Sequence, residues 1–439
     1  MTVSISRTCQ KSFVQRPTRL VDRLWRRLAL RRLSHLKRGR LMISDQRGLC
    51  ELGSLTTAGM HAELVVHDPR FYGCLVFGGI LGAVEAYQRG YWDSPNLTNL
   101  VRLFSRNLHL ARDLNTASAV PRRLRDRLGH LLRRNSRGGS KQNIAAHYDL
   151  GNEFFALFLD ETMSYSSGVF TSVTDSLAAA SQAKNDLICR KLQLTETDHV
   201  LEIGAGWGAF AIHAAQQYGC RVTTTTISQE QYELAVQRVR QAGLDDRVEV
   251  LLRDYRDLEG VYDKLVSVEM IEAVGHQYLD QFFRVCSQHL KPDGMMLLQA
   301  ITIADDRYDQ YRRGVDFIQR YIFPGGCLPS LGRIRASLRR AADFNIWHLE
   351  EFGPHYARTL ASWRERFLAA RRRLAEMGFD EAFVRTWEFY FCYCEGGFRE
   401  GAIDVSQLVL TRPRCKVPPA MVGLTGELCE LKRSDVRAF

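Results

Sequence analysis

From about residue 185 onward, short runs of apolar residues alternate with segments in which apolar residues recur every three or four positions. The first pattern is typical of strands buried on both faces, and the second of amphipathic helices. Strands are predicted in this way at 200–203, 222–226, 248–252, 264–268 and 295–301, with a final edge strand at 408–411. The alternation predicts an α/β domain built on a doubly wound parallel sheet.

The first predicted strand runs into glycines at alternate positions, Gly204, Gly206 and Gly208, and then into a helical pattern over 209–218. Glycine lacks a Cβ and tolerates positive φ, so such a turn lets the backbone approach a ligand closely. Ala209 stands where a dinucleotide fingerprint has its last glycine, so the spacing favours S-adenosylmethionine over a pyrophosphate ligand. Tight strand–helix packing is the alternative, and the glycines alone do not decide between the two.

A helical pattern also lies near the start of the chain, at 18–36, with apolar side chains on one face and arginines on the other. The arginines are Arg19, Arg23, Arg26, Arg27, Arg31 and Arg32. Such a helix either anchors a protein on anionic lipid or packs on its own domain with solvated arginines, and both interpretations stand. Trp25 on the apolar face favours the membrane. Charge reversal at Arg26, Arg27, Arg31 and Arg32 is then expected to weaken binding to anionic vesicles.

Five parts are expected along the chain. They are a basic amphipathic segment (1–37), a small α+β domain (38–120), a basic linker (121–142), a catalytic domain (143–412) and a tail (413–439). The small domain is expected to contain a hairpin around Asp45–Gly48 and a glycine-broken apolar helix near 78–87. An insertion at 304–351, after the fifth strand of the large domain, is expected to cover the substrate.

The composition of the chain indicates which kinds of molecule it binds. Lys and Arg outnumber Asp and Glu by 60 to 49, and the excess is concentrated before residue 142. An anionic surface is therefore expected as partner. Phospholipid is favoured over nucleic acid because the arginines lie far from the predicted pocket, whose segments are apolar. The eleven cysteines form no metal or disulfide pattern, so no metal is expected and a reducing cytoplasm is the expected compartment. The longest apolar run, 71–84, is too short to span a bilayer, and no secretory signal is evident.

Residues after the next two strands are candidates for holding the cofactor. Thr226 is followed by Ile227 and Gln231 where dinucleotide enzymes place a ribose-binding carboxylate. Ribose is therefore expected to be held by backbone and amide groups, with Gln231 as the candidate, although a solvated helix residue is the more common role. Asp254 can accept a hydrogen bond from an adenine amino group, and Tyr255 can lie against the ring.

Five motifs occur in order along the chain: 147–152 (HYDLGN), 163–166 (MSYS), 201–208 (LEIGAGWG), 226–231 (TISQEQ) and 321–329 (YIFPGGCLP). Together they resemble the cyclopropane-fatty-acyl-phospholipid synthase family from about 143 to 412. The segment 38–115 resembles the amino-terminal domain of the longer, bacterial-type members. The resemblance implies a seven-stranded, Rossmann-like methyltransferase sheet. It also implies transfer of the methyl of S-adenosylmethionine to a cis double bond in a phospholipid acyl chain, with proton loss and ring closure.

The resemblance further implies which residues hold the cofactor. They are Tyr165, Ser166, Glu202, Gly204, Gly206, Gly208, Thr226, Ile227, Gln231, Asp254, Tyr255 and Arg256. The expected partners are a membrane surface, on which the cytoplasmic enzyme would lie peripherally, and a second copy in a homodimer. Two rival functions remain open. One is methylation of a small amine or hydroxyl compound, and the other is nucleic-acid binding or modification.

Proton removal is assigned by the resemblance to a bound bicarbonate. Glu272 and Tyr356 match the polar cluster that holds it, with Tyr356 and the anion orienting the Glu272 carboxylate. Ser167 and Gln299 stand where the family usually has cysteine and histidine. Both can still hydrogen-bond an anion, but Gln299 cannot carry charge. If the anion is lost, a methylene- or methyl-branched chain is the alternative to a ring. Glu272→Gln is expected to cost far more turnover than cofactor affinity.

Two further groups near the C-terminus bear on the chemistry. Cys394 matches a cysteine once proposed as catalytic, but its apolar neighbours would raise the thiol pKa, so a structural role is expected. A dense set of rings is expected either to stabilise a carbocation or to pack as core. The rings belong to Trp387, Phe389, Tyr390, Phe391, Tyr393 and Phe398.

Overall fold

The computed structural model describes residues 19–54, 59–116 and 150–416. The predicted basic linker, the first three residues of the 147–152 motif and most of the predicted tail lie outside these ranges. The chain forms two compact units. Of the described residues, the first unit takes in 19–54 and 59–116 together with Glu381–Arg385, and the second takes in 150–380 and 386–416.

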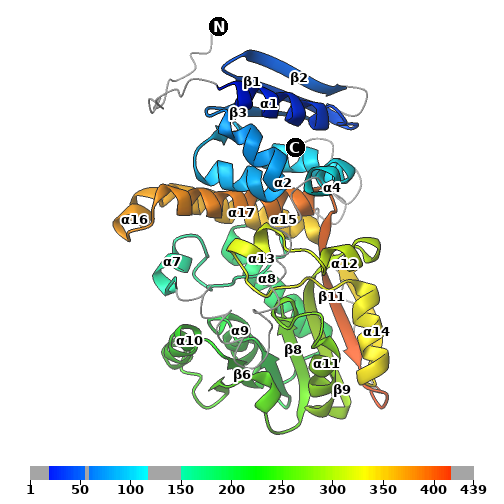
Figure 1. The fold of residues 1–439 in the computed structure, drawn as a ribbon. Coiled ribbons are helices and arrows are strands. Elements are labelled where there is room, and N and C mark those ends of the chain that lie inside the picture. Colours follow the sequence, from blue (N-terminus) through cyan, green and yellow to red (C-terminus); the bar gives the residue numbers. More distant parts are fainter. Residues whose placement is uncertain (1–18, 55–58, 117–149, 417–439) are drawn as a thin grey trace. The chain divides into compact units, whose positions relative to one another are not determined.

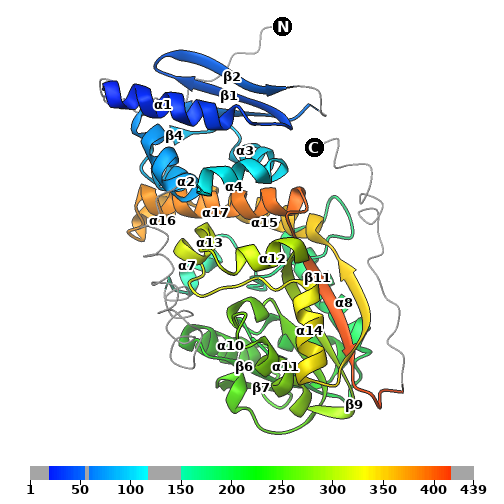
Figure 2. The same ribbon diagram turned by 45° about the vertical axis from the view of Figure 1, so that its right-hand side comes forward.

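The first unit is a small α+β arrangement around a four-stranded sheet in the order β2-β1-β3-β4. Its strands are β1 (Gly39–Asp45), β2 (Gly48–Ser54), β3 (His61–Val66) and β4 (Trp92–Asp93), and its helices are α1 (Leu20–Leu33), α2 (Arg70–Gln88), α3 (Leu97–Arg106) and α4 (Leu108–Thr116). The expected hairpin is present, with Asp45 paired to Gly48 across the turn (Figure 2). Helix α2 is kinked at Gly79, where φ is 57°, as expected of a glycine-broken helix.

Helix α1 is part of the first unit and packs against α2 and α4. The guanidinium of Arg26 is 2.6 Å from the Asp45 carboxylate, and that of Arg32 donates to the carbonyl of Val76 at 3.0 Å. These two arginines therefore tie α1 to its own unit, which corrects the expectation that both are available to a membrane. At the other end of the helix, Leu20 is 80% exposed and Leu24 is 50% exposed.

The second unit is built on a seven-stranded sheet in the order β10-β11-β9-β8-β5-β6-β7 (Figure 1). The strands are β5 (His199–Ile203), β6 (Arg221–Thr226), β7 (Val248–Leu252), β8 (Tyr262–Val268), β9 (Leu290–Ile303), β10 (Asn345–Glu351) and β11 (Ile403–Thr411). Strands β5 to β9 pair in parallel, and β11 is antiparallel to both β9 and β10. The predicted sheet is confirmed, with one correction: β11 is an interior strand, and the edge is β10, which lies within the predicted insertion.

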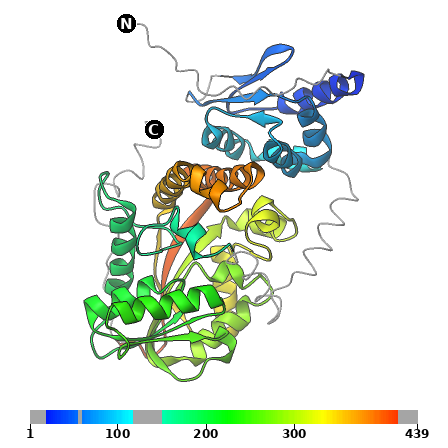
Figure 3. The same cartoon turned by 90° about the vertical axis from the view of Figure 1, so that its left-hand side faces the viewer.

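Helices cover both faces of this sheet. Residues of α11 and α14 pack on one face, and residues of α8, α9 and α10 pack on the other. The described helices after residue 150 are α7 (Asn152–Ala156), α8 (Leu177–Leu192), α9 (Ala209–Tyr218), α10 (Gln229–Gln241), α11 (Leu279–Gln288), α12 (Asp305–Tyr311), α13 (Phe317–Tyr321), α14 (Leu331–Ala341), α15 (Gly353–Ala369), α16 (Arg371–Glu376) and α17 (Glu381–Arg399). Side chains alternate along each strand, so Leu201 of β5 packs in a core with α11 and α14, while Val200 packs in a second core with α8 and α9. Figure 3 brings α9 and α10, in green, to the front of the sheet.

No helix among the described residues combines the length and apolarity that crossing a bilayer requires.

Candidate functional site

A cavity of about 360 Å³ lies over the carboxyl ends of the parallel strands of the second unit. Segments that follow β5, β6, β7 and β8 line one part of it, and the insertion after β9 lines another. All of the predicted cofactor residues except Gly208 line this cavity. Ligands of doubly wound sheets bind at this edge, so the topology and the motifs indicate the same place.

The glycine turn after β5 has the backbone that its sequence predicts. Gly204, Gly206 and Gly208 have φ values of 103°, 51° and 85°. The amides of Gly204 and Ala205 donate to the carbonyl of Thr225 at 3.0 and 2.9 Å, which holds the turn against the end of β6. A Cβ added to Gly206 would meet no protein atom within 4 Å. Gly208 stands at the start of α9, behind the wall of the cavity.

Replacing Gly206 by valine is expected to weaken binding of S-adenosylhomocysteine by at least about tenfold, equivalent to about 1.4 kcal/mol. The added side chain would occupy the ligand's side of the turn, because no protein atom lies there. Gly243→Val is the matched control, since Gly243 also has positive φ (66°) and open space around its Cβ but does not line the cavity. Isothermal titration calorimetry of both variants measures the difference. Equal affinities in the two would show that the turn does not contact the ligand.

Gln231 is buried at the cavity wall and not solvated. Its side-chain oxygen accepts a hydrogen bond from the Thr226 hydroxyl at 2.8 Å, and its backbone N–H donates to the Ser228 hydroxyl at 3.3 Å. The bond from Thr226 orients the side chain, whose NH2 group can donate to a ligand. The candidate for holding ribose is therefore in position to act as one.

Asp254 and Tyr255 both line the cavity, but each has a partner within the protein. The Asp254 carboxylate accepts from the Arg256 guanidinium at 2.8 and 2.6 Å. The Tyr255 ring lies edge-on to Phe282, with centroids 5.6 Å apart. Asp254 also accepts from the backbone N–H of Arg256 at 3.0 Å, so these bonds hold its carboxylate in a fixed orientation at the cavity wall.

Glu202, the acidic residue before the glycine turn, is buried and accepts from the Thr224 hydroxyl at 2.6 Å. Burial raises the pKa of this carboxyl to about 8, against the opposing effects of Thr224 and the nearby Lys184. Lys184 is itself buried and lines the cavity. Its charge lies close enough to act on Glu202 and also on Glu269.

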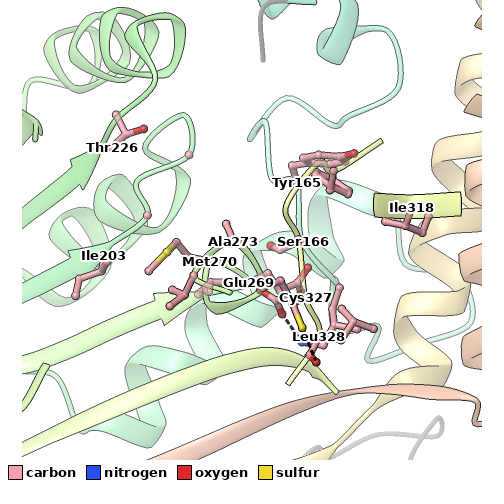
Figure 4. Close-up of a pocket in the computed structure, with 18 of the residues that line it drawn as sticks. Tyr165, Ser166, Ile203, Thr226, Glu269, Met270, Ala273, Ile318, Cys327 and Leu328 are labelled. Carbon is pink, nitrogen blue, oxygen red and sulfur yellow. Dashed lines mark hydrogen bonds between the residues drawn. The ribbon is translucent and has the colours of Figure 1, made fainter. Parts of the chain in front are cut away.

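A second polar cluster is centred on Glu269, a residue that the sequence did not single out. One oxygen of the Glu269 carboxylate accepts from the backbone N–H of Ser167 at 2.9 Å and from the side-chain amide of Gln299 at 2.7 Å. The other oxygen accepts from the hydroxyl of Tyr356 at 2.6 Å. Figure 4 shows Glu269 inside the cavity, near the loop that carries Cys327 and Leu328. Ser167 and Gln299 lie behind the wall, and Glu269 and Tyr356 form part of it.

The donors around Glu269 are themselves held in place. The side-chain oxygen of Gln299 accepts from the amide of Gln407 at 2.9 Å, and the oxygen of Gln407 accepts from the ammonium of Lys191 at 2.7 Å. Lys191 also contacts the Glu350 carboxylate at 2.7 Å. Gln299 is therefore oriented with its amide nitrogen toward Glu269. This chain of bonds joins β9, β11 and β10 to the site.

Glu272 lies in the same cavity, but its contacts differ from those expected. Its Oε1 accepts from the backbone N–H of Ile301 at 2.5 Å, and its buried Oε2 has no hydrogen-bond partner within residues 19–54, 59–116 and 150–416. Tyr356 bonds to Glu269 and not to Glu272, so the expected Tyr356–Glu272 arrangement is wrong. Burial and the neighbouring Glu269 raise the pKa of Glu272 to about 8. Two buried carboxylates so close together do not both ionise readily.

The raised pKa of Glu272 has a consequence for stability. Between the ordinary value of 4.5 and about 8, the folded chain keeps a proton that the unfolded chain has lost. The folded state binds more protons over this window, so this group lowers the free energy of unfolding increasingly as the pH rises. Glu272→Gln removes the effect. The stability of the variant relative to wild type is expected to rise between about pH 5 and about pH 8 in urea titrations. A constant difference would show that Glu272 titrates normally.

The aromatic side chains of α17 for which carbocation stabilisation or core packing was expected occupy two different places. Tyr390, Tyr393 and Phe398 line the cavity, whereas Trp387 and Phe391 pack in an aromatic core beneath it. Phe389 is also buried, against Phe317 of α13. Cys394 lines the cavity as well, and burial raises the pKa of its thiol. The thiol is thus kept protonated, which favours the structural role expected for it.

The apolar part of the cavity is formed by the β9 end, the insertion and helices α15 and α17. Among its lining side chains are Ile303, Ile318, Phe323, Leu360 and Tyr390. The hydroxyls of Tyr390 and Tyr165 are 3.2 Å apart, so each satisfies the other within apolar surroundings. The predicted insertion therefore does help to enclose the site.

Comparisons with known proteins agree with this geometry. Residues 135–408 match the family model of mycolic acid cyclopropane synthetase. The chain is 42% identical to the tuberculostearic acid methyltransferase UfaA1 of Mycobacterium tuberculosis over 76% of this chain and 79% of the relative. It is 37% identical to the cyclopropane-fatty-acyl-phospholipid synthase of Escherichia coli over 83% of this chain and 91% of the relative. The crystal structure of the mycolic acid cyclopropane synthase CmaA1 complexed with SAH and CTAB superposes with a TM-score of 0.58, at 32% identity, over 62% of this chain and 98% of that chain.

Proposed function

The chain belongs to the mycolic acid cyclopropane synthetase family of S-adenosylmethionine-dependent methyltransferases, and we propose that it adds a methyl-derived carbon to a double bond in the acyl chain of an unsaturated phospholipid. The 42% identical relative is a tuberculostearic acid methyltransferase, and the 37% identical one is a cyclopropane-fatty-acyl-phospholipid synthase. Both names refer to the addition of carbon to a fatty acyl chain. The coverage of both relatives supports carrying this substrate class over to the present chain.

The observation that carries the proposal is the division of a single cavity into two chemically different parts. One part has the glycine turn, Gln231 and Asp254, which suit a nucleoside and an amino acid moiety. The other part is apolar and aromatic, which suits a hydrocarbon. An alkene is a weak nucleophile, so the reaction needs close positioning and exclusion of water. A small polar amine or hydroxyl compound would bury little surface against the second part, whereas an acyl chain would fill it.

The residues of the chain have distinct tasks in this reaction. When bound, S-adenosylmethionine supplies a methyl group attached to a positively charged sulfur. The backbone of the turn at Gly204 and Gly206 and the side chain of Gln231 would hold it. The apolar wall excludes water, and the rings of Tyr390 and Phe398 line the cavity, where aromatic groups stabilise positive charge that develops on the substrate.

The product follows from the fate of one C–H electron pair after carbon transfer. If that pair closes a bond to the neighbouring carbon, the product is a cyclopropane ring. If a hydride first shifts so that the positive charge lies on the methyl-bearing carbon, that pair forms a double bond and the product carries a methylene branch. Both outcomes add one carbon to the acyl chain, so one assay detects either.

The direct test compares two phospholipids that differ only in unsaturation. Purified protein is incubated with methyl-labelled S-adenosylmethionine and vesicles of dioleoyl or distearoyl phosphatidylglycerol. Label is expected in the acyl chains of the dioleoyl lipid alone. Incorporation into both lipids, or into the headgroup, would contradict the proposal.

We also propose that α1 brings the protein to an anionic membrane. Exposed apolar side chains, Leu20, Val21 and Leu24, lie on the same helix as the exposed Arg27 and Arg31. Apolar residues flanked by cations are the combination that binds an interface. Arg26 and Arg32 are excluded from this role by their contacts within the unit.

Reversing the charge of Arg27 and Arg31 to glutamate is expected to weaken binding to anionic vesicles by about 30-fold. The basis is about 1 kcal/mol for each basic residue near the surface. Arg335 and Arg339 of α14 provide the matched control, because they are also exposed and four residues apart on a helix. Vesicle co-sedimentation at low and high salt measures both variants, and the effect should shrink at high salt. Equal loss in the two variants would indicate a general charge effect and not an anchor.

A further inference from the structure

The donors that would hold a bound bicarbonate are already used within the protein. The backbone N–H of Ser167, the amide of Gln299 and the hydroxyl of Tyr356 all donate to the two oxygens of the Glu269 carboxylate. A carboxylate and bicarbonate share the same planar arrangement of two oxygens on one carbon. An added anion therefore does not fit among these donors, and it would also be repelled by the charge of Glu269.

We propose that the Glu269 carboxylate takes the place of a bound anion and is itself the base that receives the proton in this reaction, so that the enzyme works without bicarbonate. The inference rests on the proposed function, because it assigns the proton acceptor for carbon addition to an alkene. It differs from what the family resemblance implies, since the base is part of the chain and not a co-reactant.

The step balances without any further reactant. The acyl chain that has gained a carbon carries one positive charge on a neighbouring carbon. A C–H bond of the added carbon breaks, and its proton forms an O–H bond with a Glu269 oxygen. The electron pair of that bond forms the last bond of a three-membered ring. If a hydride first shifts from the methyl-bearing carbon to the neighbouring cation, the charge lies beside the methyl group and the same proton loss forms a carbon–carbon double bond. The acyl chain becomes neutral, the Glu269 carboxyl becomes neutral, and its proton is later lost to solvent.

The surroundings of Glu269 suit a base that must be charged before the step. Three hydrogen bonds to its oxygens and the nearby ammonium of Lys184 favour the ionised form. Burial opposes them and raises the pKa of Glu269 above the ordinary value, which makes the carboxylate a stronger base. Glu272, with its pKa of about 8, is mostly protonated at neutral pH and leaves the negative charge to Glu269.

The backbone at Glu269 provides an independent sign that its position is imposed by the surroundings. Its φ is 48°, which is uncommon for a residue with a side chain. The Glu269 amide donates to the carbonyl of Gln299 at 2.8 Å, which holds the turn at the end of β8 against β9. Strain of this kind is kept where the structure requires a side chain in a particular place. It also means that glycine at this position is compatible with the fold.

The test uses the full chain and two substitutions at Glu269, assayed in degassed buffer with and without added bicarbonate. Wild type is expected to show the same rate in both. Glu269→Gly leaves the three donors without the carboxylate, so its rate should fall by about 100-fold or more and recover at least about tenfold with bicarbonate. Glu269→Gln still fills the space and cannot take a proton, so bicarbonate should not restore it.

A binding measurement keeps the inference testable apart from activity. Carbon-13 NMR of labelled bicarbonate is expected to show binding to Glu269→Gly and none to wild type, with S-adenosylhomocysteine affinity and melting temperature as controls for folding. Bicarbonate binding to wild type, stimulation of its rate, or an unimpaired Glu269→Gly variant would each overturn the inference. Failure of the proposed function would look different, because no variant would methylate lipid under any condition while the bicarbonate binding pattern still decided the role of Glu269.

Discussion

Replacing Glu269 by glutamine is expected to lower kcat by about 10²- to 10⁴-fold, the range that a positioned general base contributes. Glutamine has nearly the same size, and its one oxygen can still accept hydrogen bonds from Ser167 and Gln299 while its NH2 group faces the Tyr356 hydroxyl. It cannot receive a proton. Because the loss affects a group that acts after substrate binding, the affinity for S-adenosylhomocysteine is expected to stay unchanged.

Glu272→Gln is the matched control, since it makes the same substitution three residues away in the same cavity. Glu272 is mostly neutral at pH 7, so an amide there should cost much less turnover. Steady-state kinetics with unsaturated vesicles and calorimetry with S-adenosylhomocysteine measure both variants. The sequence alone favoured the opposite order, with Glu272 as the sensitive position. A larger loss in Glu272→Gln would restore that assignment and contradict the role of Glu269.

The pH dependence of kcat tests the role of Glu269 in a second way. Activity should fall on the acid side as Glu269 becomes protonated. Burial raises the pKa of Glu269 against the opposing effects of Tyr356, Ser167, Gln299 and Lys184, so this fall should lie above the pH range of an ordinary glutamate. The acid limb should be absent from the residual activity of Glu269→Gln.

Replacing Phe158 by alanine is expected to reduce the free energy of unfolding by about 3 to 5 kcal/mol. The Phe158 side chain is 0% exposed. Its ring centroid lies 5.8 Å from that of Trp387, 5.4 Å from that of Phe391 and 6.1 Å from that of Trp363. Alanine would leave a cavity among large rings that cannot move into it. This aromatic cluster joins the segment after α7 to α15 and α17, so its loss affects the second unit as a whole.

Trp347→Ala serves as the control for Phe158→Ala, because Trp347 lies on β10 and is 52% exposed. Its loss is expected to change stability by no more than about 0.5 kcal/mol. Urea titrations of both variants measure the difference. Phe158 also lies 6.0 Å from Tyr165 between ring centroids, so residual activity in Phe158→Ala should fall along with stability. A destabilisation below about 1 kcal/mol would show that the cluster is not tightly packed.

Most of the sheet was predictable from local patterns. Strands β5 and β7 are short and mostly apolar, β6 is rich in β-branched Val and Thr, and the glycine turn after β5 follows directly from its sequence. Strand β10 was missed because its side chains are mostly exposed and show no alternation of buried and exposed positions. Strand β11 was placed at the edge for the same reason, since β10 is the strand that covers it.

The cofactor part of the site was predictable from motifs, whereas the assignment of the acid group was not. Glu269 and Glu272 are three residues apart, and the family resemblance supports only the second. What distinguishes them is the positive φ at Glu269, together with donors that come from residues 167, 299 and 356. A turn conformation and three long-range contacts leave no periodic signal in a sequence. The available clue in the sequence was a second glutamate, Glu269, three residues before the Glu272 that the family resemblance supports.

The central claim is that a hydrocarbon double bond, and not a heteroatom, receives the carbon. Mass spectrometry of phospholipids from cells expressing the chain tests it most directly, with cells expressing Gly206→Val as the control. Unsaturated acyl chains are predicted to give rise to species heavier by one methylene unit, with fragmentation that places the added carbon at the former double bond. Unchanged acyl chains in cells whose expressed protein binds S-adenosylmethionine, or added mass confined to the headgroup, would contradict the account.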